Sequence, residues 1–154
     1  MGLLVSVVAG LSLAASCLSA QSAVDTATRQ WGEAPILFPR GAQMAVVSGN
    51  PGASGRFTAE LKMPDGYRWP PHFHFQDELL TVRTGTLLVG MGDKLDVAQT
   101  KAMVAGDSAT TAARMHHYAV AKGETIIAVT ADGPYTIRYV NWDEDPQKTA
   151  KWPF

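Results

Sequence analysis

The sequence predicts an all-β fold of the sandwich, jelly-roll or barrel type. From Ile36 onward, short runs rich in apolar and β-branched residues follow one another closely. Segments that carry Gly, Pro, Asn and Asp separate these runs, among them SGNPGASG, MPDG, RTG, AKGE and ADGP, and such residues favour turns. Only one stretch of the core, Asp93–Gln99, is plausible as a helix, and it is short. Many short strands at this spacing are typical of closed or two-layered β architectures.

The expected strands follow one another without a second domain boundary or an internal repeat. The first of them, Ala42–Ser48, is mostly apolar, which predicts a strand that is covered on both faces. The full set of expected strands is Ala42–Ser48, Arg56–Met63, Tyr67–His74, Glu78–Arg83, Thr86–Met91, Lys101–Val104, Ser108–Thr111, His117–Ala121, Thr125–Thr130 and Tyr135–Asn141.

Composition and charge exclude several classes of protein. The chain has 154 residues, enough for one domain with a substantial core. Its formal net charge of −1 gives no reason to expect a nucleic-acid partner or binding to an anionic membrane surface. The only cysteine is Cys17, which excludes an intramolecular disulfide framework and a cysteine-based zinc site.

The N-terminal segment MGLLVSVVAGLSLAASCLSAQSAV has no charged side chain before Asp25 and ends in small residues. This pattern predicts a secretory signal peptide over residues 1–20, with cleavage near Ala20 or Ala23, and therefore a periplasmic or secreted protein. Signal peptides normally open with Lys or Arg, which this segment lacks. A retained membrane anchor and an ordinary buried helix are the alternatives; no other membrane contact is expected.

Three segments are expected after the signal peptide. A polar lead-in covers residues 21–35, the β-barrel domain residues 36–142, and a C-terminal tail residues 143–154. After cleavage the mature chain contains no cysteine, which suits an oxidising compartment.

Two histidines lie two residues apart in the run WPPHFHFQDELLTVRTG, residues 69–85. The Pro-Pro pair before them favours an extended backbone, and side chains two apart on a strand face the same side. His72 and His74 therefore converge on one point, and Glu78 follows a turn that can bring a carboxylate there. Two imidazoles and a carboxylate can hold a divalent metal and leave positions open for a substrate. An isolated His-x-His, by contrast, is more typical of a half-buried strand without a metal.

The other two histidines of the chain, His116 and His117, form a second cluster. Adjacent residues on a strand face opposite sides, so only one of them can point inward. The pair therefore offers one further candidate ligand.

The stretch Gly66–Gly85 resembles the first conserved motif of the cupin family, G-x5-H-x-H-x3-E-x6-G, and every spacing fits. The family's second motif, G-x5-P-x-G-x2-H-x3-N, is matched less well, because Ala112 replaces the Pro, Arg114 the Gly and Ala121 the Asn. The likeness covers about residues 42–141 and is closest to small, exported, single-domain bacterial cupins.

This resemblance implies a cupin-type double-stranded β-helix, a jelly-roll barrel, with one divalent transition metal ion near its centre. Carried over by position, the metal ligands are His72, His74, Glu78 and His117, and His116 faces away. Fe, Mn, Ni, Cu, Co and Zn all suit three imidazoles and a carboxylate. Proteins that resemble this family are commonly dimers, so a homodimer is among the expected assemblies.

Three further residues are candidates for the substrate pocket. Arg114 stands where the family has a glycine, and a non-glycine residue at positive φ costs on the order of 1 kcal/mol; either the turn takes another shape or Arg114 is strained. At the pocket rim Arg114 would attract an anionic substrate, although simple exposure to solvent is the more common role of an arginine. Tyr67 and Trp69 are expected on the face of His72 and His74, where they would line the pocket; core packing is their alternative.

The leading functional prediction is a metal-dependent enzyme that acts on a small molecule, with dioxygenase-type oxidation as its leading form. No separate acid or base stands out in the sequence, which favours chemistry performed by the metal itself. The alternative is a non-catalytic periplasmic metal-binding, ligand-binding or sensor module, because a fold does not determine a function. A roomy cavity beside the metal would favour the enzyme, and a filled one the binding module.

Overall fold

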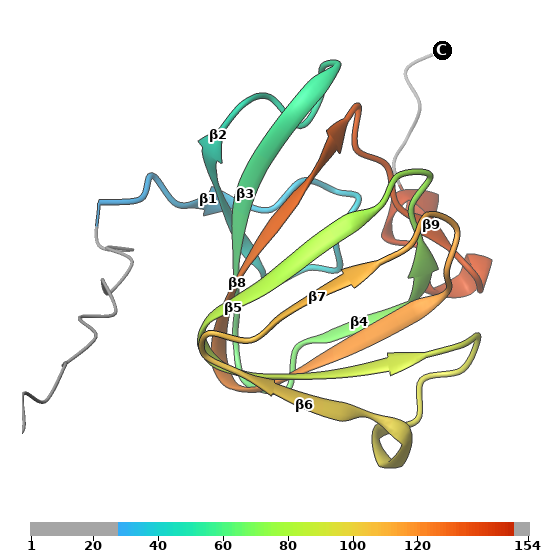
Figure 1. Ribbon diagram of the computed structural model, residues 1–154. Coiled ribbons are helices and arrows are strands. Elements are labelled where there is room, and N and C mark those ends of the chain that lie inside the picture. The colour runs from blue at the N-terminus through green and yellow to red at the C-terminus, as the bar shows by residue number, and fades with distance from the viewer. Residues whose placement is uncertain (1–27, 150–154) are drawn as a thin grey trace, which may run out of the picture.

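The structure, a computed structural model, describes residues 28–149 (Figure 1). The predicted signal peptide, residues 1–20, and the end of the predicted tail, residues 150–154, lie outside the described residues. Residues 28–149 form nine β-strands and three short 3-10 helices, with no α-helix. Within this part of the chain, no helix is long and apolar enough to cross a membrane. The all-β prediction is confirmed.

The two longest strands lie in the middle and towards the end of the described chain, and the expected helical stretch at Asp93–Gln99 contains only one 3-10 turn, η1. The strands are β1 (Gly32–Glu33), β2 (Gln43–Ser48), β3 (Gly55–Met63), β4 (Arg68–Phe73), β5 (Glu78–Met91), β6 (Lys101–Val104), β7 (Ser108–Thr111), β8 (His117–Gly133) and β9 (Arg138–Tyr139). The 3-10 helices are η1 (Val97–Gln99), η2 (Trp142–Glu144) and η3 (Pro146–Thr149).

The long strands β5 and β8 connect the two halves of the barrel. They pair with each other along most of their length, with shifts of register around Thr84–Thr86. The C-terminal part of β8 also pairs with β3, and its N-terminal end pairs with β4. β5 pairs with β7 near its start and with β6 near its end. The strands thus form one hydrogen-bonded sheet that bends through β5 and β8, with β2 and β3 at the top of Figure 1 and β6 at the bottom.

Glycines mark the bends in these two strands. The sequence divides each strand in two, at Gly85 and at Gly123, but the structure keeps the strands continuous. Both glycines have positive φ, 78° and 73°, a conformation that glycine adopts without steric cost. A Cβ atom on Gly85 would lie 2.4 Å from the carbonyl oxygen of Glu124. Glycine is therefore required here for a close approach within the bend rather than for the end of a strand.

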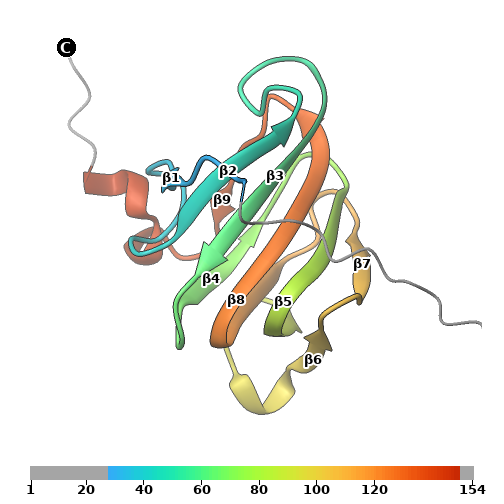
Figure 2. The ribbon, with the colours of Figure 1, turned by 90° about the vertical axis from the view of Figure 1, so that its left-hand side faces the viewer.

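Strand β2 differs from the expectation for Ala42–Ser48. Instead of being covered on both faces, it leaves Val46 and Val47 exposed by 49 % and 39 %. Among the described strands β2 pairs with β3 and with the two-residue strand β1, and Figure 2 shows β2, β3 and β8 side by side. β2 lies near the edge of the sheet, and an apolar run alone does not distinguish an edge strand from a central one.

The hydrophobic core fills the space between the two halves of the sheet, with Leu61, Leu87 and Ile127 among its most buried side chains. The segment between β1 and β2 packs onto this barrel through two tyrosines. The hydroxyl of Tyr67 donates to the carbonyl oxygen of Pro39 at 2.7 Å, and the hydroxyl of Tyr139 donates to that of Leu37 at 2.8 Å. Residues 34–42 therefore form part of the barrel wall.

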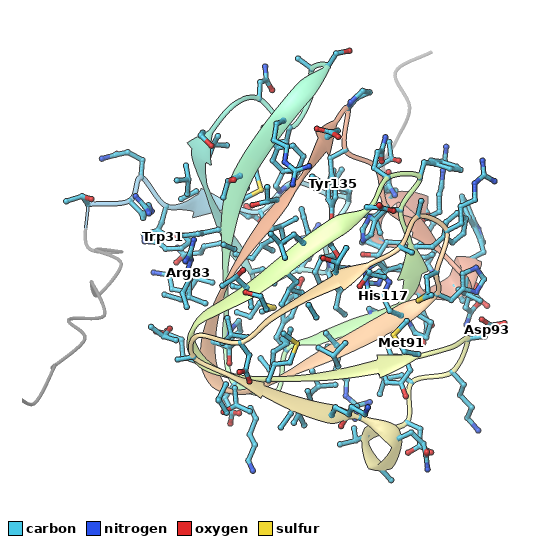
Figure 3. All side chains as sticks on the ribbon, viewed as in Figure 1. Trp31, Arg83, Met91, Asp93, His117 and Tyr135 are labelled. Atoms are coloured by element: carbon cyan, nitrogen blue, oxygen red, sulfur yellow. The ribbon has the colours of Figure 1, made fainter. Side chains whose placement is uncertain are left out.

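A fully buried carboxylate attaches the start of the described chain to β3. Glu60 accepts a hydrogen bond from Nε of Arg29 at 2.8 Å and lies 3.4 Å from Nε of Arg83. In Figure 3, Trp31 and Arg83 lie together on the side of the molecule opposite Asp93. This ion cluster supports the fold, because a buried carboxylate is stable only when it is paired.

Candidate metal centre

Three strands bring the four predicted ligands together. His72 in β4 lies directly opposite His117, the first residue of β8, in the antiparallel ladder between these strands. His74 follows the end of β4, and Glu78 is the first residue of β5. Side chains on directly opposed residues are close neighbours, so the β4–β8 pairing places imidazoles from distant parts of the sequence side by side.

The candidate ligand atoms converge on one buried point. One ring nitrogen from each of His72, His74 and His117 lies within 4.8 Å of the others. Oε2 of Glu78 lies 3.5 Å from Nε2 of His74 and 3.4 Å from Nε2 of His117. All four residues are buried, with at most 4 % of their surface exposed. Figure 3 shows His117 inside the barrel, among strands that frame the site.

Backbone carbonyls determine which ring nitrogen faces this point. In each of the three histidines Nδ1 lies within hydrogen-bond distance of a carbonyl oxygen, so Nδ1 carries the proton and Nε2 keeps its lone pair. Such outer contacts orient the imidazoles of metal sites. The contacts are His72 to Pro70 at 2.7 Å, His74 to Thr136 at 2.9 Å and His117 to Met115 at 3.0 Å.

The inward atoms fit a bound cation. Nε2 of His72, Nε2 of His117 and Oε2 of Glu78 are buried without a hydrogen-bond partner. A buried polar atom without a partner costs roughly 1–3 kcal/mol, so three of them around one point require an explanation. A divalent cation supplies it, because neutral imidazole nitrogens and a carboxylate oxygen are its usual ligands.

The electrostatics of the site favour the same protonation states. Burial, followed by the neighbouring imidazoles of His117 and His74, holds the pKa of His72 well below its usual range. Burial also lowers the pKa of His74. For Glu78 burial alone would raise the pKa, but its contacts with His117, His74 and Tyr135 outweigh burial and lower the pKa to about 2. At neutral pH the site therefore presents neutral His72 and His74 beside an ionised carboxylate, the forms that bind metal.

Tyr135 is a fifth residue of the site, and the sequence gives no sign of it. Its hydroxyl donates to Oε1 of Glu78 at 2.5 Å and lies 3.4 Å from Nε2 of His74. Its ring stacks on the imidazole of His74 with centroids 4.8 Å apart. Burial, followed by the charge of Glu78, raises the pKa of Tyr135 well above its usual value, so the phenol stays protonated. Tyr135 lies 57 residues from Glu78 along the chain, too far for any local motif to connect them.

The predicted pocket residues Tyr67 and Trp69 lie in the core. Trp69 stacks on His72 with ring centroids 4.4 Å apart, whereas Tyr67 is directed to the carbonyl oxygen of Pro39. Strict alternation does not support the expectation that Trp69 shares a face with His72, because residues three positions apart face opposite sides of an unbroken strand. A shift of register between the two residues in the β4–β8 ladder accompanies their placement on the same side.

Arg114 adopts the backbone conformation of the glycine that it replaces. Its φ is 64°, and it is the only non-glycine residue with positive φ among those the structure describes. Its amide donates to the carbonyl oxygen of His74 at 2.7 Å, while its side chain is exposed and its guanidinium carbon lies 5.3 Å from the ring centre of Phe75. Arg114 is thus strained, and it borders the metal centre through its backbone.

The side chain of His116 contacts Asp93 and Phe73, which lie outside the candidate ligand set. Its Nδ1 lies 2.5 Å from a carboxylate oxygen of Asp93, and its ring stacks on Phe73 with centroids 5.0 Å apart. Asp93 lies at the periphery of the molecule in Figure 3. This pairing attaches the segment after β5 to the start of β8.

An apolar cavity shares one residue, Tyr135, with the candidate metal centre. Its volume is about 350 Å³, and Tyr135 forms part of its wall. The hydroxyl of this tyrosine contacts Glu78, so one side chain borders both the cavity and the candidate ligands. The cavity is also lined by Pro35, Leu37, Phe38, Met44, Val46, Asn50, Pro51, Gly52, Phe57, Ala59, Leu61 and Val129.

Comparison with known proteins finds similarity in structure rather than in sequence. No protein-family model matches the chain, and no curated protein matches it significantly. The polyketide cyclase RemF from Streptomyces resistomycificus is similar with a TM-score of 0.62 at 18 % identity, over 82 % of this chain and 90 % of that one.

Two further solved structures are similar in fold. An RmlC-like cupin from Shewanella frigidimarina matches with a TM-score of 0.54 at 18 % identity, over 70 % of this chain and 86 % of that one. The DMSP lyase DddQ from Ruegeria pomeroyi matches with a TM-score of 0.54 at 17 % identity, over 70 % of this chain and 58 % of its own. The chain therefore has the β-barrel fold of the cupin superfamily, which the motif from Gly66 to Gly85 predicted.

Proposed function

We propose that this protein is a metal-dependent enzyme that acts on a small, largely apolar molecule. The observation that carries the proposal is the position of Tyr135. It lines an apolar cavity of about 350 Å³ and its hydroxyl reaches the carboxylate of Glu78. A molecule in this cavity would contact Tyr135, which connects the cavity to Glu78 among the candidate metal ligands.

The size and lining of the cavity support catalysis over a purely structural metal site. Pockets for small molecules are typically about 300–1,000 Å³ and mostly apolar, with a few polar groups that orient the ligand. Here Phe57, Leu61 and Val129 supply apolar walls, and Tyr135 supplies a hydroxyl. A metal site that only stabilised the barrel would not need an adjoining cavity.

The four candidate ligands and Tyr135 have different roles in the proposed site. His72, His74, His117 and Glu78 would hold one divalent ion, which supplies Lewis acidity and, if it is iron or copper, redox chemistry with O₂. The hydroxyl of Tyr135 holds a proton close to where a substrate would lie, and its hydrogen bond orients Glu78. The apolar walls exclude water and select for molecules without charge.

Two classes of reaction fit this arrangement. Dioxygenase-type oxidation is the leading form expected from the sequence, and it requires a redox-active ion such as iron or copper in the site. Acid–base chemistry, in which a substrate rearranges or eliminates, gains support from the protonated hydroxyl of Tyr135 and from the cyclase and the lyase among the similar structures. Consumption of O₂ distinguishes the two.

We place this activity in the periplasm or outside the cell. The charge-free apolar N-terminal segment supports export. Mass determination of the N-terminus of the protein from a periplasmic extract tests this assignment; a start at Gln21 or Val24 is expected, and an intact Met1 contradicts it.

Elemental analysis of the purified chain beside a His74→Ala variant tests the metal assignment. We expect near-stoichiometric transition metal in the parent and its loss in the variant. Oxygen uptake with simple phenols and diketones, measured with and without chelator, then tests oxidation. If neither protein takes up Fe, Mn, Co, Ni, Cu or Zn on reconstitution, the enzyme proposal is wrong and a metal-independent ligand-binding module is favoured.

A further inference from the structure

A second group of side chains, separate from the cavity, lies on the surface beside His74. Phe75 follows this histidine directly and is 43 % exposed. The guanidinium carbons of Arg114 and Arg138 lie 5.3 Å and 6.0 Å from the centre of its ring. We call Phe75, Arg114 and Arg138 the Phe75 cluster. One partly exposed aromatic ring therefore interacts with two cations, which places two positive charges in the same region of the surface.

Neither Arg114 nor Arg138 is paired with a carboxylate in the described part of the chain. Within residues 28–149 neither guanidinium forms an ion pair or a side-chain hydrogen bond, and each interacts only with Phe75. The neighbouring carboxylate of Asp77 accepts from the amide of Ala113 at 2.7 Å and does not pair with them. Each guanidinium therefore keeps its N–H donors open, and an oxyanion bound at this ring would supply the missing counter-charge.

The backbone of Arg114 gives an independent indication of function. Its φ of 64° is a conformation that glycine would adopt without strain. Strained non-glycine residues are concentrated at ligand-binding sites, where the side chain offsets the cost. The amide of Arg114 already satisfies the carbonyl oxygen of His74, and a glycine could make the same bond. What only arginine adds at this position is the guanidinium over Phe75.

We propose that the Phe75 cluster binds the carboxylate or phosphate group of a small molecule. The fork of N–H donors on each guanidinium matches two oxygens of either anion. The ring of Phe75 positions both cations, so little side-chain freedom is lost on binding. This site lies outside the apolar cavity and is additional to the proposed metal-dependent activity.

Titration of the ¹⁵N-labelled chain with sodium malonate and, separately, with sodium phosphate tests the proposal, with NaCl keeping the ionic strength constant. We expect saturating shifts of the Phe75 and Arg114 amide signals and of the Nε signals of Arg114 and Arg138. Saturation by malonate identifies a carboxylate site, and saturation by phosphate a phosphoryl site. If neither anion causes saturating shifts beyond those of NaCl, the proposal is wrong.

Arg114→Gly is the decisive variant because it removes the guanidinium while it relieves the backbone, so a loss of binding cannot be attributed to unfolding. We expect it and Arg138→Gln to bind the anion about tenfold more weakly, as the loss of a charge-assisted hydrogen-bond donor predicts. Arg68→Gln, which removes an exposed arginine at the start of β4, is the control. Equal affinity in Arg114→Gly and the parent, or an equal loss in Arg68→Gln, overturns the proposal.

Discussion

The hydroxyl of Tyr135 donates to Oε1 of Glu78 at 2.5 Å, while Oε2 of the same carboxylate lies 3.4 Å from Nε2 of His117. One oxygen of Glu78 is thus held by the barrel wall, and the other is directed at the imidazoles. The hydrogen bond from Tyr135 therefore orients the carboxylate of Glu78 before any ion is bound. Tyr135 therefore contacts the candidate metal centre through Glu78 and also lines the cavity.

Replacing Tyr135 by Phe should weaken metal binding while the fold is kept. The ring, its stacking on His74 and its packing remain, and only the hydrogen bond to Glu78 is lost. Loss of such an outer partner typically lowers metal affinity about 10–100-fold. Competition with a metal chelator measures the dissociation constant. Tyr67→Phe is the matched control, since it also removes a buried hydroxyl but one that contacts Pro39; an equal loss in both variants would contradict the role of Tyr135.

Narrowing the apolar cavity should reduce turnover without removing metal. Val46 lines the cavity at an exposed position, so Val46→Trp can fill the entrance without overpacking the core. For a phenol or diketone that proves to be a substrate in the oxygen-uptake assay, we expect kcat/KM to fall at least about tenfold, which corresponds to about 1.4 kcal/mol. Val47→Trp, at the next and also exposed residue of β2, should leave it unchanged. Normal turnover in Val46→Trp at full metal content would show that the substrate binds elsewhere.

Relieving the strain at Arg114 should stabilise the protein. Arg114→Gly should raise the free energy of unfolding by up to about 1 kcal/mol, because the positive φ costs an ordinary residue this much. Gly66→Ala is the reciprocal test, since Gly66 has a φ of 74° and no atom within 4 Å of an added Cβ. It should lower the free energy of unfolding by about the same amount. Urea denaturation measures both, and a loss of stability in Arg114→Gly would mean that the arginine side chain supports the turn.

Acid should destabilise the metal-free protein in two stages. The pKa values of His72 and His74 lie below their usual 6.5, so the unfolded chain takes up protons first and the free energy of unfolding falls as pH drops below that value. Glu78 has a pKa of about 2 instead of 4.5, and its contribution is present above 4.5 and lost as pH falls towards 2. Chemical denaturation across this range in excess chelator measures the profile. Stability that stays constant below the ordinary histidine range would contradict neutral His72 and His74.

The sequence by itself indicated the fold class and three candidate ligands, His72, His74 and Glu78; the resemblance to the cupin motifs was needed to choose His117 over His116 as the fourth. The alternation of His72 and His74, the position of Glu78 and the glycines at both ends of the motif are local features, and local spacing is enough to predict them. It also located the special backbone position at Arg114, because a residue that replaces a glycine at a turn either changes the turn or bears the strain. The sequence did not predict the boundaries of β5 and β8 correctly. Gly85 and Gly123 bend these strands, whereas a glycine more often ends a strand.

Only the tertiary structure decided what surrounds the ligands. Tyr135 reaches Glu78 across 57 residues of chain, and Phe75 meets Arg138 through the pairing of β4 with β9. Trp69 joins His72 on one side where the β4–β8 ladder shifts register, which the alternation of side chains along a strand does not predict. These contacts depend on which strands pair and how the sheet bends, and those are properties of the whole barrel rather than of any segment.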